Sequence, residues 1–222
     1  MADFQVVELF ESINGEGRFA GELANFVRLK GCNLRCNYCD TAWAYDDDAD
    51  CVVMTEEEIC RKLLDSGIYR VTLTGGEPLF RENIAVLLER INREEGLALE
   101  VETNGSVPIA PFREIAPKTS FTLDYKLPGS GMEQQMCLKN FEQVSPQDTV
   151  KFVVSDRSDM EKATEIIRRY ELDKKCTVIF SAVFDRIEPV DMVTFLQENK
   201  LNHVRVQLQL HKFIWDPQKR GV

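Results

Sequence analysis

The sequence predicts an α/β fold, an incomplete TIM-like βα barrel with about six parallel strands. Short β-branched segments alternate with amphipathic segments along its 222 residues, which favours parallel strands joined by right-handed crossovers. No repeat or Pro/Gly/Ser-rich linker interrupts this order, so residues 1–222 are predicted to form one domain. A complete barrel of eight units usually needs about 250 residues, and the shorter length therefore favours a partial barrel.

The predicted strands are short apolar runs bounded by turn residues. They are 24–29, 69–74, 97–102, 121–126, 149–154, 177–182 and 204–210.

Helices are predicted where apolar residues recur at helical spacing. Thr55 and Glu58 form a capping-box pattern that begins one helix, and Ser158 with Glu161 begins another that runs to about residue 170. Further helices are predicted over 83–93 and 190–199. Three prolines between 106 and 120 leave room for a short helix at most.

Composition excludes several classes of function. The formal net charge of −10 argues against a nucleic-acid-binding surface. No apolar run is long enough to cross a membrane, and the acidic N-terminal segment does not resemble a signal peptide, so we expect a cytoplasmic protein. The acidic run Asp46–Asp48, with Asp50 close behind, is predicted to be a solvated loop.

The chain has seven cysteines, an odd number that makes a disulfide framework improbable without a secretory signal. Four are scattered and are interpreted as small buried hydrophobic residues: Cys51, Cys60, Cys137 and Cys176. The others, Cys32, Cys36 and Cys39, share one short loop. Three thiolates can bind three irons of a 4Fe–4S cluster and leave the fourth iron open to chelate S-adenosylmethionine (SAM).

Three other interpretations of this loop stay open at this point. A structural zinc site needs four ligands, and only Cys51 is near enough in sequence to supply the fourth, because His203 and His211 are distant. An electron-transfer cluster would also need a fourth cysteine. A purely structural role for the three cysteines is the simplest alternative.

The chemistry of a βα barrel lies at the carboxyl ends of its strands. Several chemically capable segments immediately follow predicted strands: the cysteine loop, Gly75–Gly76, Thr103–Asn104 and Tyr125–Lys126. This convergence favours a catalytic role for the cysteines over a structural one.

Two motifs resemble those of the radical SAM superfamily. Residues 31–39 (GCNLRCNYC) resemble its cluster-binding signature, and residues 74–78 (TGGEP) are similar to its GGEP motif, which contacts the methionine amino group. More specific strings resemble the 7-carboxy-7-deazaguanine synthase family, from about residue 8 to the C-terminus. They are SINGEG (12–17), FVRL (26–29), CDT (39–41), ETNG (102–105) and HKFIWDP (211–217).

The resemblance implies conversion of 6-carboxy-5,6,7,8-tetrahydropterin to 7-carboxy-7-deazaguanine with loss of ammonia, a step toward queuosine and other 7-deazapurines. It implies a 5′-deoxyadenosyl radical that abstracts hydrogen from the pterin, followed by ring contraction assisted by Mg²⁺, which Thr41 would hold. A flavodoxin or ferredoxin is the expected electron donor, and a homodimer would cover the sheet edges of a partial barrel.

The resemblance also implies roles for individual residues. Those expected to contact SAM are Tyr38, Asp40, Gly76, Asp124, Tyr125, Lys126 and Ser181. Those expected to contact the pterin are Ile13, Asn14, Gly15, Arg28, Thr74 and Pro217, with the tail from about residue 211 to 222 closing the pocket. The arginine fork suits a carboxylate, although a surface salt bridge would explain Arg28 equally well.

Two positions depart from the family pattern. Asn14 stands where many relatives carry Gln, and Asp124-Tyr125-Lys126 stands where many carry Ser-Pro-Lys. Two other functions remain alternatives: an activating enzyme that installs a glycyl radical on a partner protein, and a non-catalytic iron–sulfur electron carrier. The first would need an open docking face, and the second would not cleave SAM.

Overall fold

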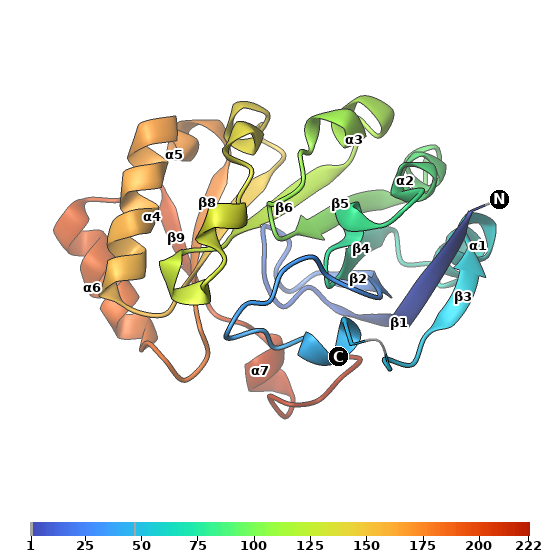
Figure 1. The fold of residues 1–222 in the computed structure, drawn as a ribbon, viewed down its shortest axis with the longest axis horizontal. Coiled ribbons are helices and arrows are strands. Elements are labelled where there is room, and N and C mark those ends of the chain that lie inside the picture. The colour runs from blue at the N-terminus through green and yellow to red at the C-terminus, as the bar shows by residue number, and fades with distance from the viewer. Residues whose placement is uncertain (1, 47) are drawn as a thin grey trace.

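The strands form one mixed sheet, shown in Figure 1 for a computed structural model that describes residues 2–46 and 48–222. Asp47, in the acidic run predicted to be a solvated loop, lies outside the described residues. Within the described ranges the sheet has nine strands in the order β3-β1-β2-β4-β5-β6-β7-β8-β9. The strands are β1 (Asp3–Ile13), β2 (Leu23–Leu29), β3 (Val52–Thr55), β4 (Arg70–Gly75), β5 (Ala98–Thr103), β6 (Ser120–Tyr125), β7 (Thr149–Val154), β8 (Thr177–Ala182) and β9 (Val204–Gln207).

β2 and the six strands from β4 to β9 pair in parallel, which confirms the predicted partial βα barrel. β7 and β8 have the predicted bounds, whereas β9 ends at Gln207 and not at Leu210. The sequence analysis missed β1 and β3, which pair antiparallel with each other, as β1 also does with β2. They extend the sheet beyond its first parallel strand.

Seven α-helices occur in the described part of the chain: α1 (Glu56–Asp65), α2 (Ile84–Asn92), α3 (Ala110–Ile115), α4 (Arg157–Tyr170), α5 (Leu172–Lys175), α6 (Pro189–Asn199) and α7 (His211–Ile214). The capping box of Thr55 and Glu58 is present at α1. The predicted start of α4 at Ser158 is wrong. Asp156 caps this helix, because its carboxylate accepts the Asp159 N–H at 3.0 Å.

The hydrophobic core lies between the sheet and the layer formed by α1 to α6 (Figure 1). Every second residue of the parallel strands points into this core, because successive strand side chains alternate between faces. Examples are Val71, Leu73, Val101, Phe121, Leu123, Val150, Phe152, Val178 and Phe180, all at most 2% exposed. Burying a side chain of this size contributes about 1.5–3 kcal/mol relative to leaving it exposed.

The opposite, concave face of the same strands is polar. Its buried residues include Thr72, Thr74, Glu100, Thr122, Lys151 and Ser181. The strand register places Arg28 beside Thr74 and Asp124 beside Lys151. Buried polar residues on one face of a parallel sheet indicate a binding site, because isolated burial of such groups is costly.

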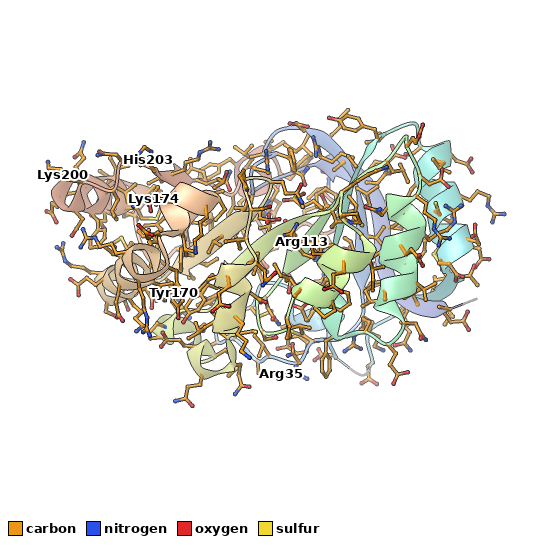
Figure 2. All side chains as sticks on the ribbon, turned by 90° about the horizontal axis from the view of Figure 1, so that it is seen from above. Arg35, Arg113, Tyr170, Lys174, Lys200 and His203 are labelled. Carbon is orange, nitrogen blue, oxygen red and sulfur yellow. The ribbon has the colours of Figure 1, made fainter. Side chains whose placement is uncertain are left out.

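Helix α3 is tied to the sheet by a buried carboxylate. Arg113 on α3 (labelled in Figure 2) pairs with Asp148 at 2.6 Å, and Asp148 also accepts the Phe121 N–H at 2.9 Å. Nearby, the Tyr170 ring packs on Phe141 with centroids 4.9 Å apart. None of the helices in the described ranges is long and apolar enough to cross a membrane.

Candidate active site

The cysteine loop leaves the carboxyl end of β2, as predicted. Cys32 and Cys36 are half-buried and Cys39 is exposed, and all three are free thiols. The loop is fixed by its own polar contacts. The Leu34 N–H donates to the Cys32 Sγ at 3.4 Å, and Arg35 donates to the Cys32 carbonyl at 2.9 Å. Amide donors to sulfur are typical of cysteines that serve as cluster ligands.

The three thiols lie close enough to influence one another's charge. Burial raises the pKa of Cys36 to about 11, partly offset by Lys126, and the Cys32 and Cys39 thiols raise it further. Burial also raises the pKa of Cys39. No three His, Cys, Asp or Glu side chains among the described residues converge on a single metal ion.

Gly75 and Gly76 bring the end of β4 against the cysteine loop. A Cβ atom on Gly75 would lie 2.4 Å from the Leu29 carbonyl oxygen, and one on Gly76 would lie 2.6 Å from the Cys32 Cβ. The Glu77 N–H then donates to the Gly31 carbonyl at 2.9 Å. The glycines are therefore needed for close packing in addition to any contact with SAM.

Glu77, which the sequence analysis did not single out as a site residue, is fully buried behind the cysteine loop. Its carboxylate accepts from the Thr103 Oγ1 at 2.8 Å and from the Asn104 N–H at 2.6 Å. Asn104 in turn donates to the Cys32 Sγ at 3.7 Å. Burial outweighs the hydrogen bonds and raises the pKa of Glu77 to about 7. Glu77 thus connects the GGEP and ETNG motifs to Cys32, an expected cluster ligand.

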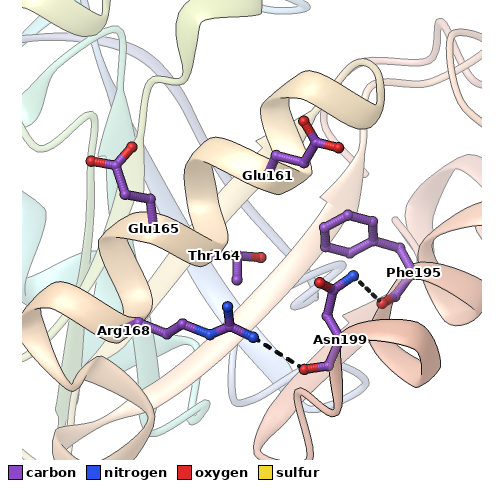
Figure 3. A pocket seen from close by; sticks show the side chains of 6 residues that line it. All are labelled: Glu161, Thr164, Glu165, Arg168, Phe195 and Asn199. Atoms are coloured by element: carbon purple, nitrogen blue, oxygen red, sulfur yellow. Dashed lines mark hydrogen bonds between the residues drawn. The ribbon is translucent and has the colours of Figure 1, made fainter.

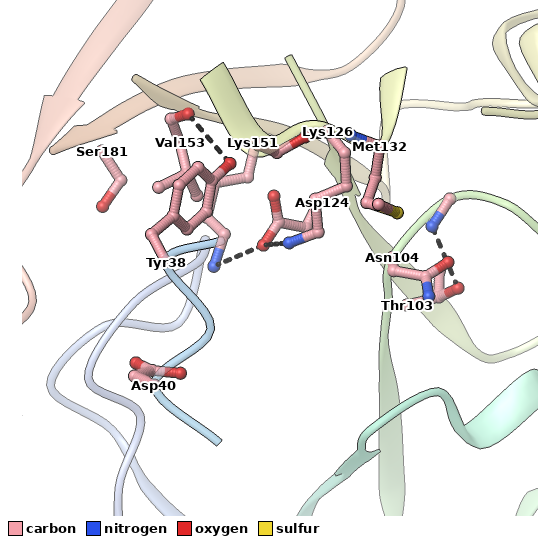
Figure 4. A network of polar contacts seen from close by, with 12 residues as sticks. Tyr38, Asp40, Thr103, Asn104, Asp124, Lys126, Met132, Lys151, Val153 and Ser181 are labelled. Carbon is pink, nitrogen blue, oxygen red and sulfur yellow. Dashed lines mark hydrogen bonds and ion pairs between the residues drawn. The ribbon is translucent and has the colours of Figure 1, made fainter. Parts of the chain in front are cut away.

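Several residues expected to contact SAM lie beside the loop, and Asp124 and Lys126 among them share a polar network (Figure 4). Lys126 pairs with Asp124 at 2.9 Å, and Lys151 lies 3.6 Å from the same carboxylate. Burial would lower the pKa of Lys126, but Asp124 outweighs it and the pKa is raised. The Tyr38 hydroxyl donates to the Val153 carbonyl at 3.5 Å. Lys126 is therefore held as a cation near Cys36.

Two residues expected to contact SAM are placed differently. The Tyr125 side chain faces the hydrophobic core and packs on Phe141 and Phe152, each with centroids 5.7 Å apart. Its hydroxyl donates to Glu133 at 3.3 Å. The Ser181 hydroxyl donates to Glu16 at 2.7 Å.

Arg28 and Thr74, expected to contact the pterin, lie on β2 and β4, and Thr41, expected to hold Mg²⁺, lies in the turn after the cysteine loop. The Arg28 Nε donates to Glu8 at 3.0 Å, and its guanidinium lies 5.9 Å from the centroid of the Trp43 ring. The structure thus contains a salt bridge of Arg28, which was the alternative explanation for this residue. Thr41 begins the short 3-10 helix η1 (Ala42–Ala44), and its hydroxyl donates to the Asp40 carboxylate at 2.8 Å.

Residues 14–17, here called the floor loop, cross the polar face of the sheet after β1. Asn14 accepts from the Thr72 hydroxyl at 2.8 Å, and Glu16 accepts from Lys151 at 3.2 Å. Burial alone would raise the pKa of Glu16. Lys151 and hydrogen bonds from Ser181 and Gln209 outweigh it and lower the pKa to about 2. Glu16 is therefore an ionised carboxylate inside the barrel.

The C-terminal tail lies against the floor loop. A Cβ on Gly15 would meet the His211 Nδ1 at 2.1 Å, so a side chain there would displace the His211 ring. Lys212 lies 3.9 Å from Asp40. Pro217 is exposed further along the tail. The structure thus brings Gly15 next to the tail that was predicted to close the pocket.

Comparison with known proteins decides the family. Residues 26–124 match the radical SAM superfamily. The chain is 48% identical over 220 residues to a 7-carboxy-7-deazaguanine synthase from Clostridium acetobutylicum, covering 99% of this chain and 100% of the relative. The chain belongs to the 7-carboxy-7-deazaguanine synthase family. A synthase from Koribacter versatilis is 36% identical, covering 98% of this chain and all of the relative.

A solved structure agrees with the fold. The crystal structure of QueE from Escherichia coli superposes with a TM-score of 0.72 and 21% sequence identity, covering 93% of each chain. Membership of a radical SAM family of synthases implies a 4Fe–4S cluster and SAM as cofactors. The three clustered free thiols, with an amide donor on the Cys32 sulfur and Lys126 nearby, fit a cluster of this kind.

A separate hollow lies outside this site, in the helical layer between α4 and α6 (Figure 3). It measures about 460 Å³ and contains none of the expected family site residues. Arg168 donates to the carbonyl of Asn199 at 3.2 Å there, and Asn199 donates to the carbonyl of Phe195 at 2.9 Å. These bonds satisfy carbonyls at the end of α6, which is a structural role.

Proposed function

We propose that this protein converts 6-carboxy-5,6,7,8-tetrahydropterin to 7-carboxy-7-deazaguanine and ammonia, a step toward queuosine and related 7-deazapurines. The observation that carries the proposal is 48% identity to a synthase of this name across essentially the whole of both chains. When bound, the 4Fe–4S cluster and SAM supply the chemistry that abstracts a hydrogen atom from the pterin carbon bearing the carboxylate.

The polar concave face favours a small substrate over a protein partner. Its charged groups are buried: Glu100 is 2% exposed and Lys151 is 8% exposed. The floor loop and the tail pack over this face. An activating enzyme would instead need an open face on which a partner protein could dock.

Arg28 and Thr74 are proposed to receive the carboxylated end of the pterin. They are register neighbours on β2 and β4. Glu8 accepts from the Nε of Arg28 at 3.0 Å, and the Nη groups of the guanidinium are proposed to receive the substrate carboxylate. Asn14 and Gly15 are proposed to contact the pterin ring from the floor loop, together with Ile13 at the end of β1.

Thr41 is proposed to hold Mg²⁺ between the cysteine loop and the substrate carboxylate. Its hydroxyl already lies 2.8 Å from an acidic oxygen of Asp40, so an oxygen-rich environment exists there. Mg²⁺ prefers oxygen ligands, keeps several waters and is commonly shared with an anionic substrate. The cation would also reduce repulsion between the substrate and the acidic protein.

Tyr38, Asp40, Gly76, Asp124, Lys126 and Ser181, with the backbone of Tyr125, are proposed to bind SAM. The cationic Lys126 beside Asp124 and Cys36 gives this region balanced charge. The tail from residue 211 onward, including Pro217, is proposed to close the pocket within a single domain. His211 and Lys212 support this by meeting Gly15 and Asp40.

Two partners are proposed for the chain as a whole. A flavodoxin or ferredoxin would deliver the electron to the cluster. A second copy of the chain would cover a sheet edge, since β3 ends the sheet on one side and exposes Val52 (65%) and Val53 (59%). Uncovered edge strands with apolar side chains favour association.

Release of ammonia coupled to consumption of the carboxylated pterin tests the proposal. The anaerobically reconstituted protein should release one ammonia per pterin consumed when SAM, Mg²⁺ and a reductant are present. Cys36→Ala should abolish the release, whereas Cys51→Ala, outside the loop, should retain it. SAM cleavage without pterin consumption would favour an activating enzyme, and no SAM cleavage would favour an electron carrier.

A further inference from the structure

The C-terminal segment (residues 207–222) contacts two parts of the proposed pterin site that are far apart in sequence. We propose that Gln207 and Arg220 are positioning residues that fasten the two ends of this segment, one to the floor loop and the other to Trp43 beside Arg28. The inference rests on the proposed function, because it assigns the floor loop and Arg28 to the pterin.

The Gln207 side chain binds both the backbone N–H and the backbone carbonyl of Gly17 in the floor loop. The Gly17 N–H donates to its Oε1 at 2.7 Å, and its Nε2 donates to the Gly17 carbonyl at 2.7 Å. A side-chain amide is suited to this task because it carries a donor and an acceptor side by side. Gly17 has a φ of +78°, so the amide holds a backbone conformation that few other residues adopt.

Neighbouring contacts extend this attachment along the loop. The Leu210 N–H donates to the Gly15 carbonyl at 3.0 Å, and Gln209 donates to Glu16 at 3.3 Å. Glu16 is held from the opposite side by Lys151 and Ser181. The floor loop is therefore bound to the last strands of the sheet and to the C-terminal segment, although it follows the first strand.

Arg220 attaches the far end of the C-terminal segment to Trp43. A turn at Asp216 redirects the chain, since its carbonyl and its side chain accept from the N–H groups of Lys219 and Gln218, both at 2.9 Å. The Arg220 guanidinium then lies 4.1 Å from the centroid of the Trp43 ring. Figure 1 shows the C-terminus beside the light-blue turn that contains Trp43.

The charges around Arg220 favour this position. It borders a hollow of about 420 Å³ whose other lining residues are Val7, Glu8, Trp43, Asp46, Asp48, Ala49 and Asp50. Among these, four are acidic, so a cation–π contact is reinforced by the local charge. This explains the residues that follow Pro217 in the tail, for which the sequence offered no role.

Trp43 connects Arg220 to the site itself. Arg28 lies 5.9 Å from the same ring, and η1, which contains Trp43, begins at Thr41. Movement of Trp43 would therefore move both Arg28 and the proposed Mg²⁺ ligand. An exposed cation–π contact shifts a two-state equilibrium by about two- to five-fold, so the effect of Arg220 alone is modest.

The first test is Gln207→Leu, compared with Gln197→Leu on the exposed face of α6. We expect the KM for the pterin to rise roughly ten-fold in Gln207→Leu, as expected for loss of about one hydrogen-bonded anchor, with a smaller change in kcat. Iron content and SAM cleavage without pterin should match wild type. An unchanged KM in a folded Gln207→Leu protein would overturn the role of Gln207.

The second test is Arg220→Gln, compared with Lys219→Gln, which removes the same charge from the adjacent residue. In a Trp215→Phe background Trp43 is the sole tryptophan, because the chain has two. Arg220→Gln should change Trp43 emission and raise the pterin KM about two- to five-fold, while Lys219→Gln should change neither. Equal effects of the two substitutions would overturn the role of Arg220.

The two arms separate this inference from the proposed function. If wild-type protein does not turn over the pterin, the proposed function fails, and the emission of Trp43 still decides whether Arg220 holds the tail. If wild type is active and the Gln207 and Arg220 variants equal their controls, the inference fails and the proposed function stands.

Discussion

Gly76 lies so close to Gly31 that a Cβ atom on it would approach the Gly31 carbonyl oxygen to 2.3 Å. The two glycines join the GGEP motif to the start of the cysteine loop. This contact fixes where the loop leaves β2, and with it the position of Cys32. The geometry of the cluster site therefore depends on the absence of a side chain at residue 76.

Gly76→Ala should prevent normal cluster assembly. The obstructing atoms are backbone and the Cys32 Cβ, at 2.6 Å, so the cysteine loop must shift to admit a methyl group. We expect at least a several-fold loss of bound iron per chain after anaerobic reconstitution, measured by iron analysis and absorbance. Gly96→Ala is the control, because nothing lies within 4 Å of its Cβ position. Equal iron content in both variants would show that the contact does not position the loop.

Lys151→Met should destabilise the fold strongly. Lys151 pairs with Glu16 at 3.2 Å, and its removal leaves this carboxylate without its cation, whereas Asp124 keeps Lys126 at 2.9 Å. Breaking a buried pair in this way costs about 3–5 kcal/mol. Denaturant unfolding should show that loss, while Lys139→Met at an exposed position should stay near wild type. A similar stability for the two variants would show that the Lys151 cation does not stabilise the fold.

Glu100 should make the protein less stable as pH rises. Burial and repulsion from Glu102 outweigh the hydrogen bond from Thr122 and raise the pKa of Glu100 from 4.5 to about 7. Between these values the folded protein keeps a proton that the unfolded chain has lost, so the free energy of unfolding falls as pH increases through this window. Glu77 contributes in the same direction.

Glu100→Gln should reduce this pH dependence, measured by denaturant unfolding at pH 5 and pH 8. The exposed Glu82→Gln is the control and should leave the slope unchanged. Glu16 does not interfere, because its lowered pKa affects stability only below its ordinary value of 4.5. A slope that is identical in Glu100→Gln and wild type would exclude Glu100 as its source.

Thr41→Ala should raise the Mg²⁺ concentration that turnover requires. The change removes the hydroxyl next to Asp40, so we expect the Mg²⁺ concentration for half-maximal activity to rise roughly ten-fold, about the effect of losing one ligand-directing contact. Thr41→Ser keeps the oxygen and should behave like wild type. If the serine and alanine variants respond alike to Mg²⁺, the hydroxyl is not a metal ligand.

The parallel part of the fold was predictable because each strand and helix carries a local signal. β7 and β8 were placed to the residue, and the capping box at Thr55 marked the start of α1. β1 was missed because it is an antiparallel strand with charged residues at several positions, including Asp3 and Glu8. Its place depends on pairing with β2 and β3, which no local pattern records.

The cysteine loop was predictable from spacing, and Asp124 was expected to contact SAM, but the other charged residues of the polar face were missed. Glu100, Glu102, Asp124 and Lys151 stand at alternate positions in otherwise apolar strands. That alternation was the available signal for a polar barrel interior. The contact of Gln207 with Gly17 could not be predicted, because the two residues are separated by 190 positions. The contact of Arg220 with Trp43 could not be predicted, because Arg220 lies at the end of an irregular tail.

The most direct test of the central claim is mass spectrometry of the reaction product. Anaerobically reconstituted protein should be incubated with 6-carboxy-5,6,7,8-tetrahydropterin, SAM, Mg²⁺ and a reductant. We predict a product with the mass of 7-carboxy-7-deazaguanine, the substrate less one ammonia, which is absent with Cys36→Ala. Recovery of unchanged pterin from a protein that carries its cluster and cleaves SAM would contradict the proposed function.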